Sequence, residues 1–281
     1  MRLQLDVWRQ QDASDAGRFE RYQVDQAGPE MSVLELLDLL NAQLVDEGRE
    51  PVAFDHDCRE GICGSCGVMV EGRPHGPVDY TPSCLQRLRS FSEGDTVRIE
   101  PFRSEAFPVL RDLVVDRSGL DRIVASGGYV STPTNAAPEA VTMPVNRDEA
   151  DQAMDFAACI GCGACVAACP NAAAQLFTGA KVAHLASLPQ GQVERAERVR
   201  NMVDTMEADF GSCTNLGECE PACPADIPLR VIAEMNTEYR KALWRHRRTE
   251  EPDRRGIRWL SRLRTGPWWQ SDPDERPPGG G

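Results

Sequence analysis

The sequence predicts an α+β fold in which a small mixed sheet with one packed helix precedes a second, helical domain. Two patterns carry this prediction. Residues 3–8 and 19–24 alternate apolar and polar side chains as strands do, whereas residues 192–208 and 229–244 repeat apolar side chains at helical spacing. Pro and Gly recur in residues 101–147 around one apolar stretch, which indicates a connector with a short helix inside it.

The first domain is expected to open with a hairpin, because its two alternating segments flank a turn at residues 12–17. Ser32 and Glu35 match a capping box ahead of leucines at helical spacing, which predicts one amphipathic helix. Further strands are expected at residues 52–54, 67–71 and 96–100. The resulting order, ββαβ, a loop and then ββ, fits a mixed sheet with one packed helix.

The net charge of −13 is spread unevenly, which bears on the partners of the chain. Residues 240–281 carry eleven Arg or Lys against six acids, so this tail is basic and the rest of the chain is strongly acidic. An acidic body argues against nucleic acid as the main partner. The tail also holds four of the five tryptophans, which suits a membrane surface or an anchor protein, or equally a solvated extension.

Length and composition limit the location of the chain. No run of about 18 apolar residues could span a bilayer, so membrane association must go through a partner or a surface segment. No secretory signal pattern precedes the first strand-like segment, which predicts reduced thiols that bind metal rather than disulfides.

The first of three cysteine groups is Cys58, Cys63, Cys66 and, further along, Cys84. The CxxxxCxxC spacing with a distant fourth cysteine is the plant-type pattern for a 2Fe-2S cluster. Interleaved glycines suit a loop that turns sharply around an anionic cluster and directs backbone N–H groups at its sulfurs. A structural zinc site is the alternative, although such sites usually use CxxC pairs.

The second group follows the CxxCxxCxxxCP spacing, in which three thiolates hold one iron-sulfur cube and the fourth serves a different cube. The third group matches that spacing except that Leu216 occupies the second position, where it would also keep water from the cluster. Crossed ligation then predicts a 4Fe-4S cluster with four thiolates and, because the other centre has only three, a 3Fe-4S cluster. The ligands would be Cys159, Cys162, Cys165 and Cys223 for 4Fe-4S, and Cys169, Cys213 and Cys219 for 3Fe-4S.

Two other outcomes remain open for the third group: a 4Fe-4S cluster whose open iron carries water, or a degenerate site that binds nothing. The predicted sets use all eleven cysteines, whereas disulfide pairing would leave an odd one. Zinc in the second domain would need a fourth ligand, and no His lies beside Cys213 or Cys219.

These motifs and their order resemble the iron-sulfur subunit of succinate:quinone oxidoreductases, the family of succinate dehydrogenase and fumarate reductase. The matching segments are Cys58-Arg-Glu-Gly-Ile-Cys63-Gly-Ser-Cys66, Cys159-Ile-Gly-Cys162, Cys169-Pro170 and the run from Cys213 to Pro224. The resemblance implies a plant-type ferredoxin (β-grasp) domain at 1–105, a connector at 106–147, a bacterial-ferredoxin-like helical domain at 148–240 and a basic, Trp-rich extension at 241–281.

In that family the subunit performs no substrate chemistry. It relays electrons between the FAD of a flavoprotein subunit and quinone at a membrane anchor, through 2Fe-2S, 4Fe-4S and 3Fe-4S clusters. The resemblance therefore implies a peripheral subunit on the cytoplasmic face of a bacterial membrane, working as succinate dehydrogenase (quinone) in respiration and the tricarboxylic acid cycle. Many relatives carry two tryptophans after the CP pair and a histidine after the first cysteine of the last group, near quinone. This chain has Asn-Ala-Ala-Ala at 171–174 and Thr214 at those places, so quinone contacts are not transferred.

Three alternatives stand beside this function. The chain could serve a fumarate reductase that works in the reverse direction, an autonomous multi-cluster ferredoxin, or a reductase that couples thiols to fumarate. Copurification with a flavoprotein and a membrane subunit distinguishes the autonomous carrier from the others. Low-temperature EPR distinguishes all of them from a structural zinc protein.

Overall fold

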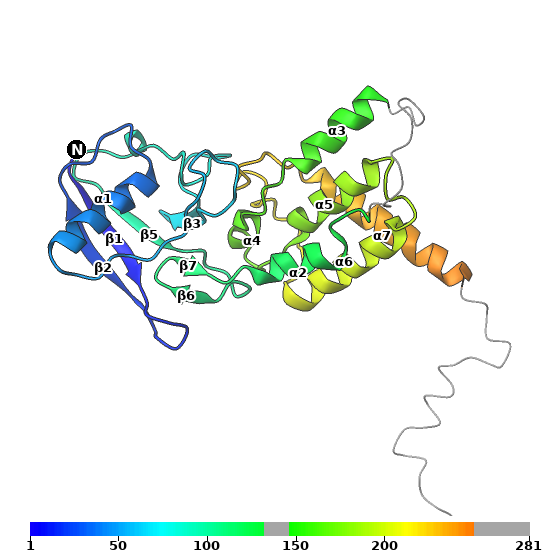
Figure 1. Ribbon diagram of the computed structural model, residues 1–281, viewed down its shortest axis with the longest axis horizontal. Helices are drawn as coiled ribbons and strands as arrows, with labels where there is room; N and C mark the ends of the chain where they lie inside the picture. The colour runs from blue at the N-terminus through cyan, green and yellow to red at the C-terminus, as the bar shows by residue number, and fades with distance from the viewer. Residues whose placement is uncertain (132–145, 250–281) are drawn as a thin grey trace, which may run out of the picture. The chain divides into compact units, whose positions relative to one another are not determined.

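The computed structural model describes residues 1–131 and 146–249 of the chain. Residues 1–243 form one compact unit, and a second unit begins at Trp244. Of the second unit, only the end of the last helix is described (Figure 1). The predicted contacts of the basic extension therefore lie almost entirely outside the described residues.

The first domain is built on one five-stranded sheet. Its strands run in the order β2-β1-β5-β3-β4, with β1 parallel to β5 and all other neighbours antiparallel. A single 3-10 turn, η1, spans Leu88–Ser90. The strand bounds are β1 Leu3–Arg9, β2 Arg18–Val24, β3 Val68–Val70, β4 Arg73–Pro74 and β5 Thr96–Pro101. The predicted hairpin is thus confirmed as β1 and β2, and the predicted strands at 67–71 and 96–100 as β3 and β5.

The helix α1, Val33–Asp46, lies across this sheet (Figure 1). The predicted capping box is present: the Glu35 backbone N–H donates to Ser32 Oγ (3.2 Å), and the Ser32 N–H donates to a Glu35 carboxylate oxygen (2.6 Å). The cap supplies acceptors for N–H groups that the first helical turn cannot satisfy. The leucines of α1 are buried in one apolar core with side chains of β1 and β5.

The strand predicted at 52–54 is absent, and two side chains explain why. Asn41 in α1 takes both backbone groups of Val52, accepting from its N–H (2.7 Å) and donating to its carbonyl (2.9 Å). The Ala53 N–H donates to the carboxylate of Asp112 (2.9 Å). The segment is therefore held by side chains and needs no neighbouring strand to satisfy its backbone.

The connector holds more structure than the sequence predicts. A small hairpin of β6, Val109–Arg111, and β7, Val114–Val115, precedes α2, Ser118–Gly127. The expected short helix is confirmed as α2, whereas the hairpin is missed because its strands are too short to show alternation.

The helical region that follows contains α3 to α7. Helices α6 and α7 confirm the predictions at 192–208 and 229–244 to within a few residues, while α3 and α5 do not stand out in the sequence. Pairs α2 with α6, α3 with α5, and α5 with α6 pack together. The bounds are α3 Arg147–Ala157, α4 Ala164–Ala168, α5 Gln175–Ser187, α6 Arg195–Asp209 and α7 Arg230–Thr249.

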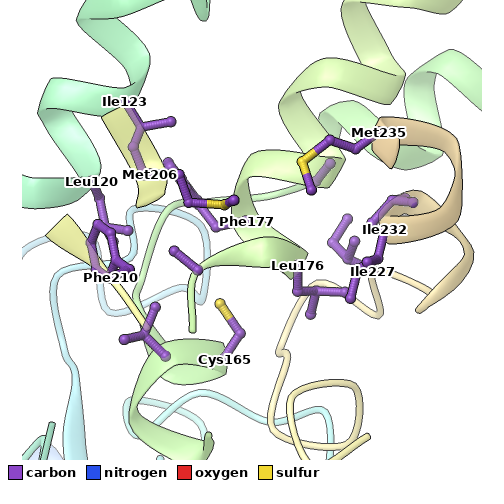
Figure 2. Packing of buried hydrophobic residues seen from close by; sticks show 14 of the residues in the cluster. Leu120, Ile123, Cys165, Leu176, Phe177, Met206, Phe210, Ile227, Ile232 and Met235 are labelled. Atoms are coloured by element: carbon purple, nitrogen blue, oxygen red, sulfur yellow. The ribbon is translucent and has the colours of Figure 1, made fainter. Parts of the chain in front are cut away.

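The apolar core of this region surrounds part of the second cysteine group. Cys165 lies in the same cluster of side chains as Leu176, Phe177 and Ile227 (Figure 2). Three aromatic side chains continue the core toward the sheet: Phe102 stacks on Phe107, and Phe107 meets Phe210 edge to face at 6.3 Å. Residues 1–243 thus share packing across the connector, and the domain boundaries near 105 and 147 stay a prediction.

The observed sheet with one helix, followed by helices, confirms the predicted α+β class. In the ranges 1–131 and 146–249, the structure contains no helix that is long and apolar enough to cross a membrane.

Candidate metal centres

All eleven cysteines lie in the described part of the chain, and all are free thiols. In the described ranges, no group of three or more His, Cys, Asp or Glu side chains is placed so that it could hold a metal ion.

The first group comes from the loop between α1 and β3, together with Cys84. Arg59, Gly61 and Gly64 take positive φ angles of 57°, 78° and 76°, which turn this loop back on itself. The Glu60 N–H donates to Cys58 Sγ (3.3 Å) and the Ser65 N–H to Cys63 Sγ (3.4 Å). Backbone donors directed at sulfur are the feature expected around an anionic cluster.

The thiols of the first group differ in environment. Burial acts against ionisation of Cys63, but hydrogen bonds from Ser65 and Cys58 outweigh it and lower the pKa of Cys63 to about 7. Burial raises the pKa of Cys66 to about 12, and the neighbouring Cys84 and Cys63 thiols add to the rise through their charge. These mutual effects place the inner members of the group together.

His75 is a buried side chain that holds the backbone next to Cys84. It is 1% exposed, and its Nδ1 accepts a hydrogen bond from the Ser83 N–H (3.2 Å), next to Cys84 in the chain. Burial, together with the charge of Arg117, lowers the pKa of His75 to about 4. A neutral His75 therefore fixes the backbone on which Cys84 lies.

Three cysteines of the second group and Cys223 of the third surround one cavity between α4, α5 and the 223–227 segment. The lining of this cavity includes Cys159, Cys162, Cys165 and Cys223. It does not include Cys169, Cys213 or Cys219. Burial raises the pKa of Cys162 to about 12, and the pKa of Cys165 is also raised well above its usual value, first by burial and then by neighbouring thiols. The structure thus brings Cys223 to the three cysteines that precede it by about sixty residues, as the crossed arrangement requires.

The last three cysteines are Cys169, Cys213 and Cys219, the predicted ligands of the 3Fe-4S cluster. Burial raises the pKa of Cys219 to about 11, and the Cys213 and Cys169 thiols contribute to the rise by their charge. The Asn215 N–H donates to Cys213 Sγ (3.4 Å). The side chain of Asn171 bridges the two chain segments that meet here.

Leu216 occupies the position where a fourth thiol would stand, and its side chain is 62% exposed. The expectation that Leu216 keeps water from this centre is therefore wrong for the chain by itself.

The donor set fits iron-sulfur clusters rather than another cofactor. Each group offers thiols alone, with backbone N–H donors at sulfur in the first and third groups and a predominantly apolar cavity at the second. Such surroundings suit a cluster that carries negative charge and exchanges electrons.

Two basic side chains that the sequence does not single out lie beside these groups. Arg117 donates to the carbonyls of Gly64 and Cys162, and Lys181 donates to the carbonyl of Cys159 (2.9 Å). Arg117 is 53 positions from Gly64 and 45 from Cys162, so no local pattern could reveal it.

Comparison with known proteins agrees with these sites. The family model of a 2Fe-2S iron-sulfur cluster binding domain matches residues 4–122, and that of a 4Fe-4S dicluster domain matches residues 158–227. Together with the thiol groups they define the chain as an electron-transfer protein with iron-sulfur clusters, which confirms the predicted class of cofactor.

Individual relatives narrow the family. The fumarate reductase iron-sulfur subunit of Haemophilus influenzae is 31% identical over 224 residues, covering 73% of this chain and 82% of the relative. The corresponding fumarate reductase subunit of Mycobacterium tuberculosis is 30% identical over 252 residues, covering 80% and 87%. The succinate dehydrogenase iron-sulfur subunit of Bacillus subtilis is 27% identical over 253 residues, covering 84% and 92%.

A chain of the Mycobacterium smegmatis Sdh1 complex in the apo form has the same fold, with a TM-score of 0.64 at 23% identity over 90% of this chain and 98% of that one. This chain belongs to the family of succinate dehydrogenase and fumarate reductase iron-sulfur subunits. Its role is electron transfer. That family carries a 3Fe-4S cluster beside the 2Fe-2S and 4Fe-4S clusters, in agreement with the three predicted cofactors.

Proposed function

We propose that this chain relays electrons between the FAD of a flavoprotein subunit and quinone at a membrane anchor, as part of a succinate:quinone oxidoreductase. The proposed ligands are Cys58, Cys63, Cys66 and Cys84 for 2Fe-2S, Cys159, Cys162, Cys165 and Cys223 for 4Fe-4S, and Cys169, Cys213 and Cys219 for 3Fe-4S. One observation supports this assignment most strongly: Cys223 lines the same cavity as the first three cysteines of the second group.

When bound, the clusters supply one-electron transfer without bond chemistry at a substrate. The chain itself holds the sulfurs, limits the access of water and compensates negative charge. Backbone N–H groups of Glu60, Ser65 and Asn215 donate to ligand sulfurs and so favour the electron-rich form. Burial of Cys162 and Cys165 acts in the opposite direction, because an apolar site disfavours added charge. The balance differs between centres, which lets one chain hold clusters of different potential.

Matched serine variants test the ligand assignment. In the crossed arrangement, Cys223→Ser perturbs the 4Fe-4S centre and leaves the 3Fe-4S signal of the oxidised sample in place. Cys169→Ser does the reverse. If each cysteine run held its own cluster, the two variants would exchange their effects, and low-temperature EPR with iron and sulfide analysis separates the outcomes.

The working direction is proposed to be succinate oxidation, with fumarate reduction as the alternative. Relatives named for both reactions match at similar identity. The test is to purify the chain with its partners in mild detergent and compare succinate:quinone with quinol:fumarate turnover. Loss of both the flavoprotein and the anchor from a stable, cluster-loaded chain would favour an autonomous carrier instead.

The proposed location of the chain is the cytoplasmic face of the membrane, where the anchor holds it and residues 241–281 contact the membrane surface. Basic and aromatic residues of that extension suit anionic headgroups. Protease treatment of inside-out and right-side-out vesicles tests the face. Flotation with anionic and neutral vesicles tests the surface contact, since binding that ignores lipid charge would contradict it.

A further inference from the structure

One guanidinium lies between the first and second cysteine groups. Arg117 directly precedes α2, and its Nη1 donates to the Gly64 carbonyl at 2.6 Å and to the Cys162 carbonyl at 2.9 Å. Its Nη2 also approaches the carbonyl of Ser65 at 3.4 Å. Gly64 and Ser65 separate two thiols of the first group, and Cys162 belongs to the second, so one side chain is bonded to both loops.

The two loops are in tight contact at Gly64. A Cβ at this position would lie 2.5 Å from the Ile160 carbonyl oxygen and 3.1 Å from the Cys162 nitrogen. The backbone also has φ of +76°, which side chains disfavour. Only glycine allows this contact. Arg117 donates to one carbonyl on each side of the contact, that of Gly64 and that of Cys162.

Charge is concentrated at the same place. Arg117 and Lys181 line one cavity together with Cys63 and Cys159, and Asp121 is the only acid among the lining residues. Lys181 donates to the carbonyl of Cys159, another thiol residue of the second group. The positive charges are therefore directed at the peptides that carry the cysteines of both groups.

We propose that Arg117 is a positioning residue for electron transfer between the first and second centres. Its Nη1 donates to both the Gly64 loop and the Cys162 loop, with Nη2 beside Ser65, and so holds the two loops together, while its charge favours the reduced form of each centre. The step moves one electron from one centre to the other, with no bond formed and no proton required. This inference rests on the ligand assignment proposed above.

The chemistry of arginine suits this task better than that of lysine. Its planar guanidinium can donate to two carbonyls in a fixed geometry, whereas an ammonium on a flexible stem is only a point charge. Field and geometry can therefore be separated by substitution. Arg117→Lys keeps the charge and loses the fork, while Arg117→Gln loses the charge and keeps a shorter amide donor.

Arg122→Gln is the matched control, because this arginine lies in the helix that Arg117 precedes and bonds to Asp209 and Ser118 rather than to a cysteine loop. All variants are compared in the full complex. Three quantities are measured: cluster content, the reduction potentials of the first two centres, and the relaxation enhancement of the first centre's EPR signal when the second is reduced. The last depends on the separation of the two centres and needs no turnover.

Arg117→Gln is expected to lower the equilibrium constant for reducing each of the two centres about tenfold, which is about 59 mV for a one-electron couple. Arg117→Lys is expected to keep both constants within about twofold of the parent while the relaxation enhancement weakens. The inference is overturned if Arg117→Gln and Arg122→Gln have the same reduction potentials. It is also overturned if Arg117→Lys shows the same relaxation enhancement as the parent.

The outcomes also separate this inference from the proposed function. A parent complex without the three EPR signals refutes the ligand assignment, whereas a fully loaded parent with unresponsive Arg117 variants refutes only the role of Arg117. If Arg117→Gln does not retain its clusters, Arg117→Lys and Gly64→Ala decide the question. Gly64→Ala forces the loops apart without a change of charge, so relaxation should weaken more than the potentials shift.

Discussion

Replacing Asp112 with alanine is expected to destabilise residues 1–243 by about 3–5 kcal/mol. Asp112 is 3% exposed and accepts from Arg9 Nε (3.1 Å), the Gln10 N–H (2.9 Å) and the Ala53 N–H (2.9 Å). Alanine leaves two backbone N–H groups without this acceptor, at about 1–3 kcal/mol each. Arg9 retains carbonyl partners at Glu50 and Pro51, so its share of the loss is small.

The assay is anaerobic thermal unfolding of the cluster-loaded chain, followed by near-UV and visible circular dichroism. At about 2–4 °C per kcal/mol, the apparent Tm should fall by roughly 6–20 °C. Asp25→Ala is the matched control, because its ion pair with Arg2 is largely exposed and such pairs contribute little to stability. If the Asp112→Ala variant has the same apparent Tm as the Asp25→Ala variant, Asp112 is not the buried anchor of the 52–54 segment.

Three further predictions follow from single positions. Leu216→Cys should supply the missing thiolate, replace the oxidised-state 3Fe-4S EPR signal and add about one iron per chain, whereas Val45→Cys, at an exposed position of α1, should change neither the signal nor the iron content. Because burial lowers the pKa of His75 to about 4, the unfolded chain binds this proton more readily than the folded one. Stability should therefore fall by up to about 3 kcal/mol as the pH drops from about 6.5 to 4, and His75→Gln should lose that part of the pH dependence of Tm. Ser32→Ala removes the cap of α1 and should lower stability by about 1 kcal/mol, measured as a fall in Tm of about 2–4 °C; an unchanged Tm would contradict the role of the capping box.

Local chemistry explains which elements were predictable. The hairpin of β1 and β2 and the helix α1 follow from alternation, helical spacing and a capping box, all of which act within a few residues. The 52–54 segment has the apolar composition of a strand, yet Asn41 and Asp112 satisfy its backbone. Those partners come from other elements, so the error could not be seen in the segment itself.

The sequence by itself determined the class of this protein, the kinds of cofactor and the three thiol groups, because cysteine spacing and number are local and countable. It also indicated that Cys223 should return to the second group. Only the tertiary structure decided how the groups meet. Helices α5 and α6 lie between the two cysteine runs and bring the chain back to the same cavity. The chain then places Arg117 between two loops that are about fifty residues away from it. Contacts at such separations depend on packing of the whole unit, which no local spacing records.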